Sequence, residues 1–380
     1  MNILIVNFEY PPLGGGGGVA TKQIAQELSA RHTVTVLTTG FMGLPKREMD
    51  GQVEVVRVLV LGRTGKPTAT LLSMLTFVLT AFWAGLWLCR EKKFTVINAQ
   101  FVIPSGMPAA ALSWLFTIPL VVSFIGGDIY DPSKGISPHR YPVLRLLIRW
   151  ITRQATACTA ISEDTRHRAQ DLHGIRKEIM ITHLGLEPAR VSPKTRPELG
   201  LGAGITCITV GRLIPRKAYE VLLLAWQQVK EANLLIIGDG PLKDKLQDLI
   251  VQYGLQERVK LLGFVSDEAK QQLLRVSDIY VSAAEHEGFG IVFLEAMDAG
   301  LPIVAANEGG HTDFLFEGKQ ALLVGVNDAD ALAAAVNRLA ANEGLRRSMA
   351  AICRETVTHF YLRETTKRFE TVLVWAAQRV

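Results

Sequence analysis

The sequence contains few cysteines, and no two of them lie close together. Cys89, Cys158, Cys207 and Cys353 form no C-x-x-C pair. This scatter excludes a zinc knuckle and a disulfide framework, and it suits a reducing cytoplasm. Low-complexity tracts are missing, and only 20% of the residues are charged, so the composition argues against disorder. The first residues lack the basic segment and cleavage site of a secretory signal, which predicts a cytoplasmic protein.

Charge is unevenly divided between the two halves. Residues 1–185 contain 19 Lys and Arg against 12 Asp and Glu, a net of +7, and residues 186–380 contain 22 against 24, a net of −2. A basic half can face an anionic membrane, a phosphorylated acceptor or nucleic acid. We expect no nucleic-acid partner, because the chain lacks a zinc finger, an aromatic RNA-binding strand and a dense run of basic residues.

Short apolar runs rich in β-branched residues alternate with longer helical segments along the chain. Such runs are typical of parallel strands buried on both faces, and the alternation predicts repeated β-α-β units. The predicted strands are Asn2–Phe8, Thr33–Thr38, Val53–Val60, Thr95–Asn98, Leu120–Phe124, Thr156–Ala160, Ile179–Thr182, Ile205–Val210, Asn233–Ile237, Val259–Leu262, Ile279–Ser282, Ile303–Ala306 and Ala321–Val324.

Residues 187–204 contain three prolines and three glycines without an apolar period, which indicates a linker. We therefore predict an α/β protein with two doubly wound, Rossmann-like domains that face each other across a cleft. The N-terminal domain covers 1–186 and the C-terminal domain covers 205–365. A final helix over 366–380 is expected to pack back on the N-terminal domain.

The strongest motif is EHEGFGIVFLEAMDAG at 285–300, which places Glu287 and Glu295 at a loop-to-helix junction after a strand. Its glycines permit close backbone approach, and the free N–H groups at the helix start attract a diphosphate. Glu295 lies further into the helix and can accept hydrogen bonds from a ribose diol. The alternative to a ligand site is an ordinary capped helix with two surface glutamates. The junction contributes Gly288, Phe289, Gly290, Ile291 and Val292 as expected ligand contacts.

Two more motifs follow strands of the second half. GRLIPRKA at 211–218 places Arg212 and Lys217 after a strand, where a guanidinium and an ammonium can neutralise two phosphates. We interpret Arg216 as ordinary surface basicity. GDGP at 238–241 makes a tight turn against which a nucleobase can lie, and a plain turn is an equal alternative.

Five consecutive glycines, Gly14–Gly18, separate the first predicted strand from a helix. Gly15, Gly17 and Ala20 spell G-x-G-x-x-A, but the next strand offers no acidic residue for a ribose, so a dinucleotide is disfavoured. We interpret the run as a mobile loop that closes over the cleft.

Together these motifs resemble the retaining glycosyltransferases of family four, which have the two-domain GT-B architecture. The E-x7-E pair is Glu287 and Glu295, and G-R-L-x-x-x-K is 211–217; GDGP, ISE at 161–163 and EGG at 308–310 also fall in family order. The resemblance covers nearly the whole chain. It implies a uridine- or guanosine-diphosphate hexose as donor. The implied donor contacts also include Gly15, Gly16, Gly17, Gly211, Gly238 and Gly240.

The resemblance implies that Arg212 and Lys217 bind the diphosphate, Glu295 the ribose and Glu287 the donor sugar. It also implies retention by same-face attack, in which the leaving phosphate takes the acceptor proton, so that no protein base is required. We expect no metal and no cofactor besides the donor substrate, with a glycan, lipid-linked or small-molecule acceptor. The alternatives are a catalytically silent sugar-nucleotide-binding protein and, less favoured, an NAD-dependent oxidoreductase.

The N-terminal half departs from the family pattern. Where relatives carry H-G-x-D, this chain has IGGD at 125–128, and Asn98 and Gln100 stand where two more histidines often occur. Asp128 is therefore the catalytic candidate there, with a helix or turn cap as its alternative. His286 and His311 are expected to make structural hydrogen bonds.

Two aspartates in the C-terminal half imitate a metal motif. Asp328 and Asp330 spell D-x-D, but they open a helical segment, where Asp is an ordinary N-cap. We therefore assign them no metal.

Two apolar segments bear on membrane contact. Pro67–Cys89 carries no charge over 23 residues, which is long enough to span a bilayer. It falls between two predicted strands, so we expect a buried or membrane-touching crossover helix. LRLLIRWITR at 144–153 places Arg145, Arg149 and Arg153 on one helix face. Such a helix lies on an anionic membrane surface, or its apolar side packs in the core. Peripheral attachment to the inner face of the membrane is left open.

Overall fold

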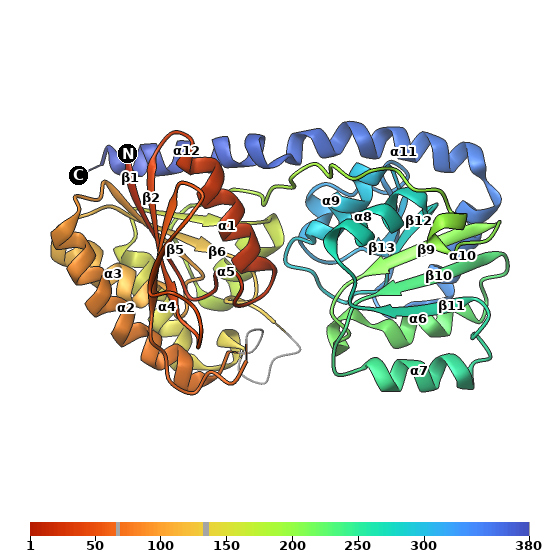
Figure 1. The fold of residues 1–380 in the computed structure, drawn as a ribbon, viewed down its shortest axis with the longest axis horizontal. Helices are drawn as coiled ribbons and strands as arrows, with labels where there is room; N and C mark the ends of the chain where they lie inside the picture. The colour runs from red at the N-terminus through yellow and green to blue at the C-terminus, as the bar shows by residue number, and fades with distance from the viewer. Residues whose placement is uncertain (66–68, 132–136, 380) are drawn as a thin grey trace. The chain divides into compact units, whose positions relative to one another are not determined.

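The computed structural model describes residues 1–65, 69–131 and 137–379, and Pro67 and Thr68 of the apolar stretch lie outside them. The chain forms two compact units, Met1–Gly185 with Leu362–Val380, and Leu186–Tyr361. Each unit has one sheet of mainly parallel strands covered by helices, so the predicted two-domain α/β fold is confirmed (Figure 1).

The first unit contains an eight-stranded sheet with the order β3-β4-β2-β1-β5-β6-β7-β8. All neighbours are parallel except β3 and β4, which pair antiparallel at one edge. Its strands are β1 (Asn2–Asn7), β2 (Thr33–Thr39), β3 (Arg47–Asp50), β4 (Val53–Val58), β5 (Val96–Gln100), β6 (Leu120–Phe124), β7 (Ala157–Ala160) and β8 (Ile179–Ile181). The sequence did not predict β3, whose four residues are mostly charged.

Two helical layers cover this sheet. Helices α2 (Leu71–Glu91), α3 (Gly106–Phe116), α4 (Pro142–Gln154) and α5 (Glu163–His173) each pack on the next and share one face (Figure 1). This placement follows from right-handed crossovers that all advance in the same direction across the sheet. Helix α1 (Gly16–Ser29) packs with α12 (Leu362–Ala377) on the opposite face.

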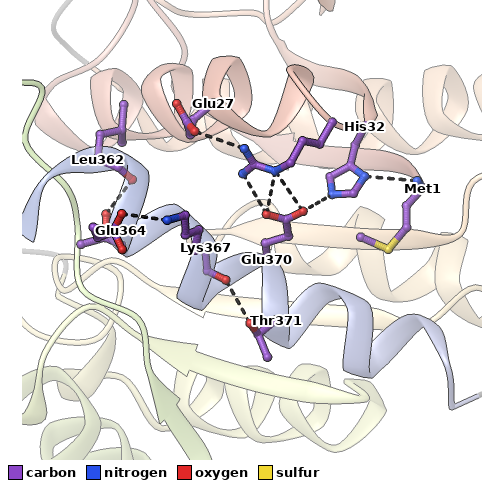
Figure 2. Close-up of polar contacts among 10 residues, drawn as sticks. Met1, Glu27, His32, Leu362, Glu364, Lys367, Glu370 and Thr371 are labelled. Atoms are coloured by element: carbon purple, nitrogen blue, oxygen red, sulfur yellow. Dashed lines mark hydrogen bonds and ion pairs between the residues drawn. The ribbon is translucent and has the colours of Figure 1, made fainter.

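The C-terminal helix α12 is held to the first unit by a charged cluster (Figure 2). The carboxylate of Glu370 accepts a hydrogen bond from Arg31 Nη2 at 2.8 Å and lies 2.6 Å from His32 Nε2. The Nδ1 atom of His32 lies 3.2 Å from the amino group of Met1. The hydrogen bond from Arg31 is the main cause that lowers the pKa of Glu370. These contacts join the two ends of the chain within one unit.

The second unit contains a six-stranded parallel sheet with the order β11-β10-β9-β12-β13-β14. Its strands are β9 (Ile205–Val210), β10 (Ala232–Ile237), β11 (Val259–Gly263), β12 (Ile279–Ser282), β13 (Ile303–Ala306) and β14 (Ala321–Val324). Its helices are α6 (Tyr219–Trp226), α7 (Lys243–Gln252), α8 (Asp267–Val276), α9 (Ile291–Ala299), α10 (Ala329–Ala341) and α11 (Glu343–Val357). The chain builds outward from β9 in both directions, which makes a topological switch point between β9 and β12.

Candidate active site

The two strongest sequence motifs meet at the switch point of the second unit. The GRLIPRKA segment leaves the carboxyl end of β9, and the segment containing Glu287 leaves the carboxyl end of β12. These two strands are neighbours in the sheet. Ligands of doubly wound folds bind at this kind of edge, so the sheet topology brings the predicted donor residues together.

Glu287 lies at the centre of a buried ion cluster. Its side chain is only 8% exposed, and its carboxylate is paired with Lys217 Nζ and lies 3.4 Å from Arg216 Nη1. Burial alone would raise the pKa of Glu287, but the charges of Lys217 and Arg216 outweigh it and lower the pKa below its ordinary value. Glu287 is therefore ionised at neutral pH and acts as a hydrogen-bond acceptor, not as an acid.

The expectation that Arg216 is ordinary surface basicity is wrong. Its guanidinium donates to the backbone carbonyl of His286 at 3.1 Å and faces the Glu287 carboxylate. The short 3₁₀ turn Pro215–Lys217 presents two consecutive cations to one carboxylate. Lys217 Nζ has three N–H donors, so its bond to Glu287 leaves others for a phosphate.

Glu295 lies in the second turn of α9, and its side chain is 11% exposed. Its Oε1 accepts a hydrogen bond from Lys270 Nζ of α8 at 2.8 Å, a partner that the sequence did not suggest. Within the described part of the chain, Glu295 Oε2 is buried and has no hydrogen-bond partner. Burial raises the pKa of Glu295, and Lys270 only partly offsets this effect.

The glycines of the site are required by close backbone packing. A Cβ atom on Gly238 would lie 1.8 Å from the carbonyl oxygen of Gly211, and one on Gly240 would lie 2.5 Å from that of Leu213. The GDGP turn therefore packs directly on the GRL loop. Gly290 has a φ of 86° and caps the start of α9, whose first turn contains no acidic residue. The first turn of α9 therefore offers its positive end to an anion, and no carboxylate within that turn competes for it.

Arg212 is exposed at the carboxyl end of β9. In contrast, His311 is buried, and its Nε2 lies 2.7 Å from the carbonyl oxygen of Ala306, as expected for a structural histidine. His286 is also buried. Of these three residues, Arg212 has the exposure that a phosphate contact needs.

Candidate residues of the first unit lie at the carboxyl ends of its central strands. The run Gly14–Gly18 is only partly a loop, because α1 begins at Gly16. A Cβ atom on Gly17 would lie 2.4 Å from the ring of Phe101, which explains a glycine inside the helix. Gly15 and Gly16 have open space beside their Cα atoms, and Gly15 N–H donates to the Glu9 carboxylate at 3.0 Å.

Asp128 binds backbone within the first unit. Its carboxylate accepts hydrogen bonds from the N–H groups of Val102 at 2.6 Å and Ile125 at 3.0 Å. These bonds favour the turn-cap interpretation over a catalytic role. Where relatives carry histidines, Gln100 donates to Asn98, and Asn98 donates to Ser123. These amides form a buried hydrogen-bonded network at the strand ends.

The D-x-D segment is structural. Asp328 caps α10 by accepting the Ala331 N–H at 2.8 Å, and Asp330 accepts a hydrogen bond from Gln228. In the described ranges, no group of three or more His, Cys, Asp or Glu side chains is arranged to hold a metal ion.

Two family models match the chain. The model of the glycosyl transferases group 1 family matches residues 192–356, and that of the glycosyl transferase 4-like domain matches residues 15–185. An uncharacterized glycosyltransferase of Methanocaldococcus jannaschii is 26% identical, over 99% of this chain and 98% of its own length. A GDP-mannose-dependent phosphatidylinositol monomannoside mannosyltransferase of Mycobacterium tuberculosis is 29% identical, over 57% of this chain and 61% of its own.

Solved structures show the same fold. Sucrose-phosphate synthase from Thermosynechococcus elongatus superimposes with a TM-score of 0.85 at 18% identity, over 100% of both chains. The Anabaena protein HepE in complex with UDP gives 0.79 at 22% identity, over 99% of this chain and 100% of its own. Both the family models and the architecture lead to one assignment. The chain belongs to the group 1, family-four-like glycosyltransferases and has their GT-B fold.

Proposed function

We propose that the protein is a retaining, metal-independent hexosyltransferase. It would move a hexose from a uridine- or guanosine-diphosphate sugar to a glycan, lipid-linked or small-molecule acceptor. Family membership supports glycosyl transfer, and the donor assignment rests on the second unit. Peripheral membrane contact by a cytoplasmic enzyme belongs to the same proposal.

The single observation that carries the donor site is the state of Glu295. One carboxylate oxygen is bonded to Lys270, while the other is buried and has no partner in the described ranges. A buried acceptor without a donor is costly, and a ribose hydroxyl would satisfy it. The exposed Arg212, the remaining donors of Lys217 and the start of α9 would bind the diphosphate.

The proposed chemistry uses positive charge, not a protein base. The bond between the anomeric carbon and the leaving phosphate oxygen breaks, and a bond to the acceptor oxygen forms on the same face. The acceptor proton passes to the leaving diphosphate. Arg212 and Lys217 would stabilise the charge on the diphosphate, and the ionised Glu287 would accept hydrogen bonds from the sugar hydroxyls.

A panel of radiolabelled UDP- and GDP-hexoses, incubated with the full chain and candidate acceptors, tests this proposal. Thermal shifts with the nucleotide diphosphates measure binding separately from turnover. Arg212→Gln with Lys217→Met should abolish turnover, whereas the exposed control Arg338→Gln should retain it. Near-normal activity of the double variant would refute the phosphate site.

A catalytically silent binding protein is the second candidate. It is favoured by the replacement of the family histidines with Asn98 and Gln100, which bond to each other and to Ser123 instead of projecting as free bases. A thermal shift without turnover on any donor would support it.

A further inference from the structure

The long apolar helix α2 exposes a continuous stripe of large apolar side chains. It is the described helix that is long and apolar enough to cross a membrane, yet its inner side packs in the core through Phe77, Ala81 and Leu88. Both ends lead into strands of the same sheet, so α2 lies on the protein. Every fourth residue of its outer side is between 52% and 66% exposed, namely Leu71, Leu75, Leu79, Trp83 and Trp87.

Helices α3 and α4 extend this surface. A Cβ atom on Gly85 would lie 2.3 Å from Leu112, and one on Gly106 would lie 2.9 Å from Ile151, so the three helices are closely packed neighbours. They lie together on one side of the sheet (Figure 1). We call the exposed apolar residues of α2, α3 and α4 the apolar face. Its members on α3 and α4 are Trp114, Leu115, Val143, Leu146 and Trp150.

Tryptophans gather at one end of the apolar face. Four of the six tryptophans of the chain are exposed, at 47–78%, in the second halves of these three helices. The helices end just before β5, β6 and β7 begin, so their C-terminal ends lie at the amino edge of the sheet. Tryptophan is enriched at the boundary between lipid and water, because its ring is apolar and its N–H is polar. The earlier turns expose leucine and valine instead.

The same edge carries unpaired positive charge. A groove of about 580 Å³ beside the end of α4 is lined by Arg149, Arg153, Arg176 and Lys177, and no acidic residue lines it. Arg149 and Lys177 donate to backbone carbonyls. In the part of the chain that the structure describes, none of the four cations is paired with a carboxylate. The groove is thus suited to a phosphate.

Helix α4 combines both features. Ile148 and Ile151 are buried in the core, so that much of its apolar side packs inward. Leu146 and Trp150 are exposed, however, and Arg153 follows them on the outer surface. A helix that only covered a core would not need both an exposed tryptophan and uncompensated arginines. A protein partner would be expected to meet a polar rim of both signs, whereas the charged residues that line this groove are all cations.

We propose that the apolar face and the adjoining cationic groove form a docking surface for an anionic lipid bilayer. The tryptophans lie at head-group level, and the groove contacts lipid phosphates. This inference deepens the proposed function by naming the membrane surface that the enzyme uses. It does not require turnover, so vesicle binding can fail while glycosyl transfer holds, and the reverse.

Vesicle co-sedimentation of the full chain tests the surface. Phosphatidylcholine vesicles with 30% phosphatidylglycerol, at 50 mM salt, should bind the protein and shift its tryptophan emission to the blue. Trp83→Gln with Trp114→Gln should reduce binding at least about tenfold. The matched control changes exposed apolar residues of the second unit, Phe264→Gln with Val251→Gln, and should bind like wild type.

The cationic groove has its own variant. Arg153→Gln with Arg176→Gln should lower affinity for anionic vesicles about 25-fold, at about fivefold for each charge. Arg338→Gln with Lys260→Gln removes the same charge from the second unit and should lower it far less. Circular dichroism and the melting temperature without nucleotide confirm folding of every variant.

Three results would overturn the proposal. The first is wild-type binding by the folded tryptophan variant, and the second is indifference of binding to lipid charge. The third is a dimer, seen by sedimentation velocity, that the tryptophan changes abolish while vesicles are not bound, because it would assign the face to a second copy of the chain.

Discussion

Replacing Glu295 by glutamine gives the sharpest test of the donor site. Lys270 Nζ donates to Oε1 at 2.8 Å, and Oε2 is buried. Lys270 will hold the amide oxygen of the glutamine, so the amide nitrogen takes the place of Oε2. The substitution thus replaces the hydrogen-bond acceptor Oε2, which would face a ribose hydroxyl, by an N–H donor of nearly the same size.

The expected loss of nucleotide affinity in Glu295→Gln follows from the strength of the hydrogen bond between the carboxylate and the ribose hydroxyl. A hydrogen bond to a charged group is worth about 1.5–3 kcal/mol, which corresponds to about 10- to 150-fold in Kd. Titration calorimetry with the nucleotide diphosphate that most raises the melting temperature of wild type measures the change. Glu257→Gln, on the exposed turn before β11, is the matched control and should leave Kd unchanged.

The pH dependence adds a second readout. Burial raises the pKa of Glu295, so the carboxylate takes up a proton at a higher pH than an ordinary glutamate. Wild-type affinity should therefore fall as pH falls through this raised pKa, and that part of the profile should be flat in Glu295→Gln. A variant Kd within twofold of wild type at pH 8, or an unchanged pH profile, would refute the ribose assignment.

Three further predictions concern metal, pH and packing. Turnover should survive EDTA, since side-chain cations and the start of α9 supply the positive charge; loss that manganese restores would contradict this. Glu370→Gln should lower the free energy of unfolding by about 1 kcal/mol at pH 7. Because hydrogen bonding to Arg31 lowers the pKa of Glu370, its contribution is complete above the pKa of unfolded glutamate and is lost as pH falls through the lower folded value; urea melts showing the same deficit at pH 7 and pH 2.5 would contradict it. Gly238→Ala should destabilise by about 1–3 kcal/mol more than Gly254→Ala, since both have positive φ but only position 238 meets a backbone oxygen; equal urea midpoints would refute the packing argument.

The sequence predicts most strands of the two sheets, because buried parallel strands are short, apolar and rich in β-branched residues. Strand β9 begins and ends at the predicted residues. It lies between β10 and β12 and is buried along most of its length, and such a position favours apolar, β-branched side chains. Strand β3 could not be predicted. Its residues Arg47–Asp50 pair only with β4 at the sheet edge, where charged side chains discourage further pairing and look like a loop.

The sequence also predicts only part of the candidate site. Strand ends place Arg212, Lys217 and Glu287 near each other by topology alone. Lys270 comes from the amphipathic helix α8, where nothing in the local sequence separates it from a solvated lysine. Arg216 differs from a surface arginine only because its 3₁₀ turn faces the buried Glu287. Only their tertiary contacts, and no local sequence pattern, place these two cations in the candidate site.

The two glutamates of the E-x7-E pair are held in opposite electrostatic states. Glu287 faces two cations, which lower its pKa in spite of burial. Glu295 faces one, and burial prevails, so its pKa is raised. The role that we propose for Glu287, to accept hydrogen bonds from sugar hydroxyls, requires a carboxylate that stays charged at every working pH, and the first environment keeps it charged. The ribose contact that we propose for Glu295 is compatible with the second environment. The ribose hydroxyl would supply the hydrogen bond that Oε2 lacks, and this bond favours the charged form of the carboxylate. The opposite pKa directions therefore follow from the second cation at Glu287 and from the Asp267 carboxylate, which shares Lys270 with Glu295.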